Sequence, residues 1–134
     1  MQIRTYLDAG VLIAAARGTL PFAAKALAIL EDPQREFVSS DYVRMEILPK
    51  PTFHRMREEV AFYEEFFRMN TFVLPFHVDH LEQAFTQACT YGLSAFDALH
   101  GVAAQVTNCD ELVTSERPTS PLFRLKGVHV VSLH

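Results

Sequence analysis

The stretch I-R-T-Y-L-D-A-G-V-L-I (Ile3–Ile13) joins a strand, an acidic residue and the start of a helix. Ile3–Leu7 is rich in β-branched, aromatic and aliphatic residues, which predicts a strand that ends at Asp8. Ala9–Ala16 is small and apolar, which predicts a helix with Asp8 as its N-cap. A strand followed at once by a helix is the building unit of α/β folds.

The same unit recurs along the chain. Further strands are expected at 36–39, 71–76, 111–114 and 128–133. Helices are expected at 22–30, from 40 or 41 to 48, at 53–69 as the longest one, from 79 to a stop at Gly92 with Asp79 as the N-cap, and at 95–106. Helical spacing predicts that two of them face the core, helix 53–69 with Phe53, Met56, Val60, Tyr63 and Phe67, and helix 95–106 with Phe96, Leu99, Ala103 and Val106. We therefore predict an α/β fold, a three-layer αβα sandwich with a central parallel sheet of four to five strands, as one domain over 1–134.

The composition is that of an ordinary globular chain: 134 residues, 49% hydrophobic and 21% charged. Cys89 and Cys109 form no metal-ligand or disulfide framework, so we expect both to be reduced and buried, as suits the cytoplasm. No apolar run approaches the roughly 20 residues that span a bilayer, and the N-terminus lacks the pattern of a signal peptide. We expect a cytoplasmic protein without a membrane partner.

The net charge of −4, taken alone, argues against a nucleic acid partner. The chain has 16 acidic residues and 12 Lys and Arg. Four acids gathered in one metal site would account for the whole excess, so the sign of the net charge does not decide the partner.

Four acidic residues fall where such a site would form: Asp8, Glu46, Asp97 and Glu116. Asp8 and Glu116 follow predicted strands, and ligands of open parallel sheets bind outside the carboxyl ends of the strands. Glu46 and Asp97 lie in the first two turns of predicted helices. All four converge if the strands before Asp8 and Glu116 are neighbours, and carboxylate oxygens suit Mg²⁺ or Mn²⁺.

Each acid also has a simpler interpretation. Asp8 alone is equally well explained as an N-cap, and Asp97 alone is better explained as the capping partner of Ser94. Glu46 and Glu116 alone are most simply solvated surface acids. The sequence around the four acids, taken together, favours the shared site.

Four blocks of the chain resemble the PIN-domain family of metal-dependent ribonucleases. They are Y-L-D-A-G-V-L-I (Tyr6–Ile13), F-V-S-S-D-Y-V-R-M-E-I (Phe37–Ile47), G-L-S-A-F-D-A-L-H-G-V-A-A (Gly92–Ala104) and E-L-V-T-S-E (Glu111–Glu116). They occur in the family's order and span nearly the whole chain, and small members are often VapC-like toxins paired with an antitoxin. The resemblance implies that Asp8, Glu46, Asp97 and, in the fourth acidic position, Glu116 bind Mg²⁺ or Mn²⁺ and activate the attacking water.

Two positions depart from the family pattern. Glu116 stands where the family usually has Asp, and its longer side chain reaches about 1.5 Å further, against a catalytic tolerance of roughly 0.5 Å. Either the backbone compensates or Glu116 holds a water. Gly10 stands where a small polar residue is common, which removes one hydrogen bond near the metal. Thr114 and Ser115 either supply hydroxyls to the site or are ordinary polar turn residues.

Other residues leave alternatives open. Lys50, Arg55 and Arg57, with His54 between them, either grip an RNA backbone or form a solvated helix start. His100, one turn after Asp97, either contacts a carboxylate or, as the favoured interpretation, packs at the helix surface. Phe62 and Phe66 either form a homodimer or antitoxin surface or lie in a well-buried helix.

The sequence favours a metal-dependent endoribonuclease, a VapC-like toxin with an RNA substrate, an antitoxin partner and a homodimeric state. The first alternative is a non-catalytic RNA- or partner-binding module whose site is degraded at Glu116 and Gly10. The second is a metal phosphohydrolase with a closed pocket for a small substrate. Fold alone does not choose among them.

Overall fold

The computed structural model describes residues 2–134 and confirms the α/β fold. Its central sheet has five parallel strands in the order β3-β2-β1-β4-β5. The strands are β1 (Ile3–Leu7), β2 (Arg35–Ser40), β3 (Phe72–Leu74), β4 (Glu111–Thr114) and β5 (His129–Ser132). The chain order reverses at β1, because β2 and β3 lie on one side of it and β4 and β5 on the other. This reversal is the topological switch point of the sheet.

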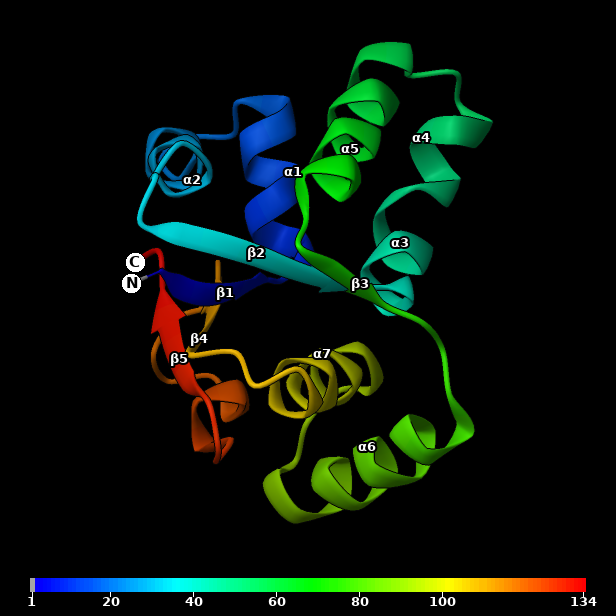
Figure 1. Cartoon of the computed structure of the whole chain (residues 1–134), viewed down its shortest axis with the longest axis vertical. Helices are drawn as coiled ribbons and strands as arrows, with labels where there is room; N and C mark the ends of the chain where they lie inside the picture. Colours follow the sequence, from blue (N-terminus) through cyan, green and yellow to red (C-terminus); the bar gives the residue numbers. More distant parts are fainter. Residues whose placement is uncertain (1) are drawn as a thin grey trace.

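Helices cover both faces of the sheet (Figure 1). One face carries α1 (Ala9–Arg17), α2 (Ala23–Leu30) and α5 (Arg57–Met69), and the other carries α6 (Val78–Tyr91), α7 (Ala95–Val106) and the 3-10 helix η1 (Pro121–Arg124). Two short helices, α3 (Asp41–Ile47) and α4 (Pro49–Phe53), follow the carboxyl end of β2. The predicted three-layer αβα sandwich is therefore correct. In residues 2–134 no helix is both long and apolar enough to cross a bilayer.

The predicted helix 53–69 is wrong in its first turn. The chain turns at Arg55, which has a φ of 54°, so α4 ends at Phe53 and α5 begins at Arg57. Phe53 and Met56, expected in the core, are 81% and 44% exposed. The 13-residue α5 is also shorter than the 14-residue α6.

The core face of α7 is also different from the prediction. The expected Phe96 and Val106 are 37% and 40% exposed, whereas the helix buries the small side chains around Gly101 and Ala103. A Cβ on Gly101 would lie 2.9 Å from Leu125 Cδ2, so this close packing requires glycine. Small residues let the backbone of α7 approach its neighbours, and the larger residues are displaced outward.

Several helix ends follow the predicted signals. Asp8 caps α1 by accepting from Val11 N at 3.2 Å, Ser94 caps α7, and Gly92 ends α6 with a φ of 71°. The N-cap of α6 is His77, not Asp79. Both cysteines are free, but only Cys109 is buried, while Cys89 is exposed.

Candidate metal site at the carboxyl edge of the sheet

The strands before Asp8 and Glu116 are neighbours, which is the condition for the four acids to converge. Strand β1 pairs with β4 along its carboxyl half, with Leu7 opposite Val113. Asp8 follows β1 directly, and Glu116 follows β4 by two residues. Helices α3 and α7, which carry Glu46 and Asp97, pack against each other at the same edge. The predicted residues thus come from four elements that meet at the switch point.

Asp8 is the most deeply placed of these acids and is only 6% exposed. Burial raises its pKa from 3.8 to about 6, and the negative charge of Asp97 adds to this rise. The side chain of Thr114, the charge of His100 and the Val11 N–H act in the opposite direction. The Thr114 hydroxyl thus lies beside Asp8, and its role in the site stays a prediction.

Asp97 is half-buried and lies in the electrostatic field of the other three acids. Its pKa is raised, first by loss of hydration and then by the negative charge of Glu116, with a smaller contribution from Glu46. Ser94 opposes the rise through hydrogen bonding to the carboxylate. Two carboxylates with raised pKa values, each in the field of other acids, form a site whose charge a cation would relieve.

Glu46 does not lie free at the surface. Its Oε1 is 2.7 Å from Nε2 of His100, a side chain that is itself only 2% exposed. The favoured interpretation of His100 as a surface-packed residue was therefore wrong, and its contact with a carboxylate was the correct alternative. The signal was present in the sequence, because His100 lies one turn after Asp97 and shares its side of the helix.

Glu116 is held by its own loop. Its Oε2 accepts a hydrogen bond of 2.8 Å from Ser120 Oγ, and its backbone N–H donates to Thr114 Oγ1 at 3.0 Å. The second departure, Gly10, has a steric cause. A Cβ on Gly10 would collide with Ser115 Oγ, which occupies the space of a larger residue beside Asp8. Ser115 thus places a hydroxyl near Asp8, in the region where Gly10 lacks the small polar side chain that is common in the family.

No lysine or arginine within residues 2–134 forms an ion pair with any of these four acids. In the same part of the chain, no group of three or more His, Cys, Asp or Glu side chains is arranged so that it could hold one metal ion. Glu46 and Glu116 instead form hydrogen bonds with His100 and Ser120, respectively. The donor set nevertheless fits Mg²⁺ or Mn²⁺, which need oxygen ligands and can be bound through one or two carboxylates with water completing the shell. Asp8 and Asp97 would supply the direct contacts, and Glu46 and Glu116 would act through water.

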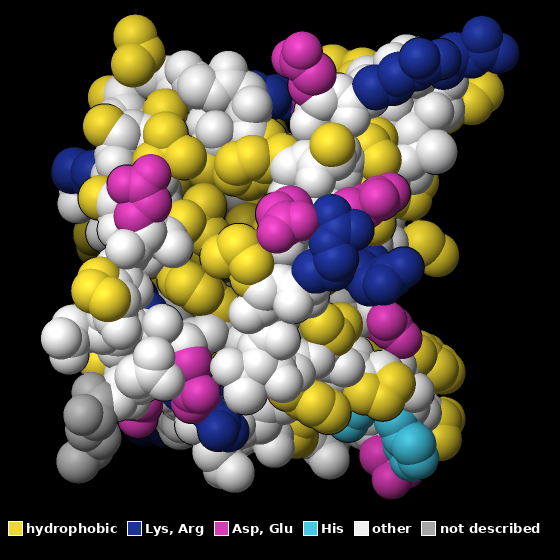
Figure 2. Space-filling view, turned by 45° about the horizontal axis from the view of Figure 1, so that its top comes forward, with side chains coloured by type: hydrophobic (Ala, Val, Ile, Leu, Met, Phe, Trp, Pro, Cys, Tyr) yellow, Lys and Arg dark blue, Asp and Glu magenta, His cyan; other side chains and the backbone are white. Residues whose placement is uncertain are grey.

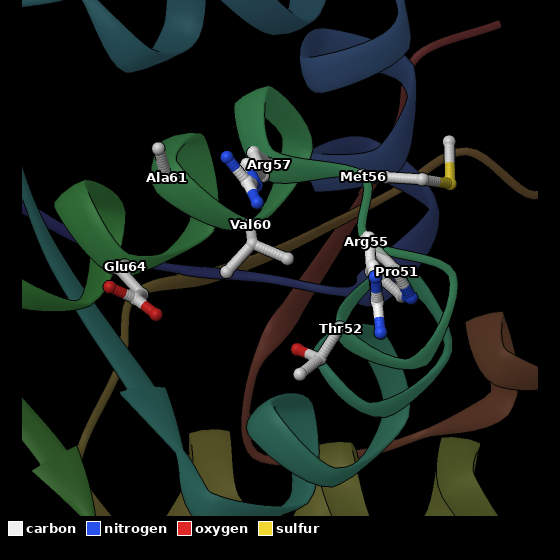
Figure 3. Close-up of a pocket in the computed structure, with 8 residues that line it drawn as sticks. All are labelled: Pro51, Thr52, Arg55, Met56, Arg57, Val60, Ala61 and Glu64. Atoms are coloured by element: carbon white, nitrogen blue, oxygen red, sulfur yellow. The ribbon is translucent and has the colours of Figure 1, made fainter.

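The basic run lies on the α4–α5 hairpin, away from the sheet (Figure 1). Arg55 and Arg57 line a cavity of about 310 Å³ between the two helices, together with Thr52, Val60 and Glu64. Figure 3 shows both guanidinium groups on the same side of this cavity and Glu64 at its other end. Lys50 is exposed on α4. An RNA contact through Lys50, Arg55 and Arg57 stays a prediction.

A second, apolar hollow lies between α2 and α5. It is lined by Leu27, Leu30, Glu31, Phe62, Glu65, Phe66 and Met69. Figure 2 shows apolar side chains gathered in a depression on this face, with acidic side chains beside it. Phe66 is 3% exposed and Phe62 is half-buried, so the sequence expectation of a buried helix holds for Phe66, while Phe62 forms part of a surface hollow.

The model of the PIN domain matches residues 5–117. The chain belongs to the PIN domain family. The four acids of the candidate site all lie within the matched residues, and the fold described above is that of the PIN domain. Among curated proteins, no sequence matches this PIN domain.

Solved structures with the same fold come from several bacteria. A chain of the Rickettsia felis VapBC2 complex, bound to a DNA fragment from its promoter, has a TM-score of 0.72 and 14% identity, with 97% of this chain and 98% of that chain covered. Mycobacterium tuberculosis VapC20, a toxin that cleaves the sarcin–ricin loop, has a TM-score of 0.68, 16% identity and coverage of 93% and 98%. A chain of a Klebsiella pneumoniae toxin–antitoxin complex has a TM-score of 0.65, 21% identity and coverage of 97% and 98%. The PIN domain thus has the fold of these proteins at nearly full length.

Proposed function

We propose that this PIN domain, as a single domain over residues 1–134, is a metal-dependent endoribonuclease of the VapC type. The observation that carries the proposal is that Asp8, Glu46, Asp97 and Glu116 lie around the switch point and have no lysine or arginine partner within residues 2–134. Such a set of acids is costly to keep close unless a cation joins it. Membership in a nuclease family supports the same interpretation.

When bound, Mg²⁺ or Mn²⁺ supplies Lewis-acid polarisation of the phosphoryl oxygens and lowers the pKa of a water. The buried Asp8, which Thr114 and the Val11 N–H stabilise, would hold the cation. The half-buried Asp97 would also bind it, and its partial exposure suits it to orient the attacking water. The water oxygen attacks phosphorus in line, the bond to the 3′ oxygen breaks, and a proton passes to that oxygen. The products are a 5′-phosphate and a 3′-hydroxyl.

RNA is the proposed substrate, and the α4–α5 hairpin is its proposed contact. Lys50, Arg55 and Arg57 form no ion pair within residues 2–134, so their charges are available to phosphates. The similar M. tuberculosis toxin is described as cleaving an RNA loop. We expect Arg55→Gln with Arg57→Gln to lower RNA affinity and to reduce the dependence of binding on salt by up to about two phosphate contacts.

An antitoxin is the proposed protein partner, since two of the similar structures are toxin–antitoxin complexes. The apolar hollow between α2 and α5 suits an amphipathic helix, and Glu31 and Glu65 at its sides favour basic flanks on that helix. Homodimer formation is proposed through the outer face of α6, where Leu81 and Phe85 are 51% and 72% exposed. We expect Phe85→Glu to convert the dimer to a monomer in light-scattering measurements.

The decisive experiment incubates the purified protein with a mixed RNA pool and Mn²⁺. We expect cleavage that EDTA stops, with 5′-phosphate ends on the products. The second candidate, a non-catalytic RNA- or partner-binding module, is favoured by the turning of Glu46 and Glu116 toward His100 and Ser120. It predicts RNA retention without cleavage at any Mn²⁺ concentration, and that result would exclude the nuclease.

A further inference from the structure

A chain of buried hydrogen bonds leads from the sheet to Glu46. Ser40 Oγ lies 2.7 Å from Tyr6 Oη, and Tyr6 Oη lies 2.9 Å from His100 Nδ1. His100 Nε2 then lies 2.7 Å from Glu46 Oε1. Tyr6 and Ser40 have no exposed surface, and His100 is 2% exposed. The four residues come from β1, β2, α7 and α3. This series of hydrogen bonds therefore connects every element around the site except β4 and α1.

A carboxylate oxygen accepts but does not donate, so Nε2 of His100 donates to Glu46 whether the imidazole is neutral or protonated. In the neutral form Nδ1 is an acceptor, and Tyr6 Oη donates to it. Tyr6 Oη in turn accepts from Ser40 Oγ, which accepts from Val43 N at 3.3 Å. Each buried polar atom thus has a partner, and the last donor in the series points at Glu46.

The other oxygen of Glu46 is left available. Within residues 2–134, Glu46 Oε2 makes no hydrogen bond, and the only contact that holds the carboxylate comes through Oε1. A glutamate side chain has three rotatable bonds and ordinarily loses much conformational freedom when it is ordered. His100, which cannot move in its buried position, orders this side chain in advance.

We propose that His100 is a positioning residue that fixes the Glu46 carboxylate for cation binding at the carboxyl edge. The inference rests on the proposed metal-dependent function, and it names a residue outside the four acids on which that function depends. Tyr6, itself bound to Ser40, holds the imidazole at Nδ1, and Nε2 on the other side of the ring holds Glu46. Partners of this kind, one step behind the ligands, typically contribute 10- to 100-fold to metal affinity.

The protein contains a matched tyrosine–histidine pair, with the tyrosine on α3 one turn before Glu46 and the histidine on α6. Tyr42 Oη lies 2.9 Å from His80 Nδ1, the same contact at the same distance as between Tyr6 and His100. No carboxylate contact is found at Nε2 of His80 within residues 2–134. His80→Asn therefore measures the effect of disturbing a tyrosine–histidine contact that positions no acid.

The test is Mn²⁺ binding by calorimetry on the full chain without RNA. In His100→Asn the side-chain amide replaces Nδ1 and can still meet Tyr6, but it is too short to reach Glu46. In His100→Gln the amide reaches the position of Nε2 and can donate to Glu46. We expect His100→Asn to weaken Mn²⁺ binding about tenfold, the lower end of that range because Glu46 acts through water, His100→Gln to restore most of it, and His80→Asn to bind as the wild type does. Cleavage by His100→Asn should recover when the Mn²⁺ concentration is raised.

Wild-type affinity in His100→Asn would overturn the inference, and so would equal losses in the Asn and Gln variants. If His100→Asn does not fold, Tyr6→Phe replaces it, because it removes only the hydroxyl behind the imidazole, and unchanged Mn²⁺ affinity in that variant would overturn the inference. If the wild type binds Mn²⁺ and cleaves RNA, and His100→Asn has the same Mn²⁺ affinity, only the positioning role is refuted. A wild-type protein that binds no Mn²⁺ refutes both this role and the proposed function.

Discussion

Acidic residues lie at both ends of the parallel sheet, but the partners of these acids differ between the two ends. At the amino edge three acids have an arginine partner: Arg4 Nε lies 2.9 Å from Glu36, and Arg35 lies 2.7 Å from Glu111 and 2.9 Å from Asp32. At the carboxyl edge, within residues 2–134, the four acids contact only hydroxyls, backbone N–H groups and His100.

The difference separates stabilising acids from costly ones. An acid beside an arginine stays charged in the folded protein, because folding itself brings the two side chains together as an ion pair. Asp8 and Asp97 lose hydration without gaining such a partner, and the pKa values of both are raised. Acids that the fold itself leaves uncompensated are the ones expected to meet a cation from outside.

The largest expected effect is on cleavage. Asp8→Asn and Asp97→Asn should each lower RNA cleavage roughly 1000-fold, because each removes a charge from a site that supplies several kcal/mol of transition-state stabilisation. Both variants should fold, since Asn also caps helices and can replace Asp8 at the start of α1. Cleavage rates with Mn²⁺ measure the effect, and an Asp110→Asn variant at the amino edge should cut normally. Full activity in both carboxyl-edge variants would show that the acids are misassigned.

The next effect is on the pH dependence of stability without metal. Because the pKa of Asp8 is raised from 3.8 to about 6 in the folded state, folding favours its protonated form. The resulting stability is fully present below pH 4 and is lost as the pH rises through 6, an effect of roughly 3 kcal/mol. Urea unfolding in EDTA should show the wild type losing this much more than Asp8→Asn between pH 4 and 7.5. Parallel curves for the two proteins would contradict the burial of an uncompensated acid, and added Mn²⁺ should reduce the difference.

At the amino edge the expected effect is on stability alone. Arg35→Gln leaves Glu111 and Asp32 without their partner, and the side chains of Arg35 and Glu111 are only 19% and 12% exposed. We expect a loss of about 2 kcal/mol in unfolding free energy, between the values for exposed and buried pairs. Arg68→Gln, which breaks a pair that is 66% and 60% exposed, is the control and should change little. A change in Mn²⁺ affinity in Arg35→Gln would mean that the two edges are not independent.

The smallest expected effect concerns Glu116. Because Ser120 holds its carboxylate and it reaches the cation through water in our proposal, Glu116→Gln should weaken Mn²⁺ binding only about tenfold. Calorimetry compares this loss with that of Asp97→Asn, which should be much larger. Equal losses would place Glu116 in direct contact with the ion.

The sequence predicted the parts of this molecule that depend on local signals. Strand β1 and the Asp8 and Ser94 caps are encoded within a few residues, and Gly92 ends its helix because it alone tolerates the positive φ there. Helical periodicity was misleading where tertiary packing decides. It placed Phe53 in the core, although the turn at Arg55 separates α4 from α5 and leaves Phe53 81% exposed.

The site shows the same division. The four acids could be found from strand ends and family blocks, but their partners could not. The contact between Glu46 and His100 joins residues 54 positions apart, and whether a histidine is buried beside a carboxylate depends on how α3 packs against α7. The arginine pairs of the amino edge likewise join residues on different strands, so a sequence alone does not separate paired from unpaired acids.

Gly10 and Ser115 share one small volume beside Asp8, and this constrains the order in which the two positions can change during evolution. A side chain introduced at position 10 would collide with Ser115 Oγ in its present rotamer, so the hydroxyl must rotate away or be removed. A serine at position 10 is therefore more easily accepted after Ser115 has been shortened to alanine or glycine. In related chains we expect a small hydroxyl at one of the two positions more often than at both, and in a double-substitution experiment the swap Gly10→Ser with Ser115→Gly should be tolerated better than Gly10→Ser alone.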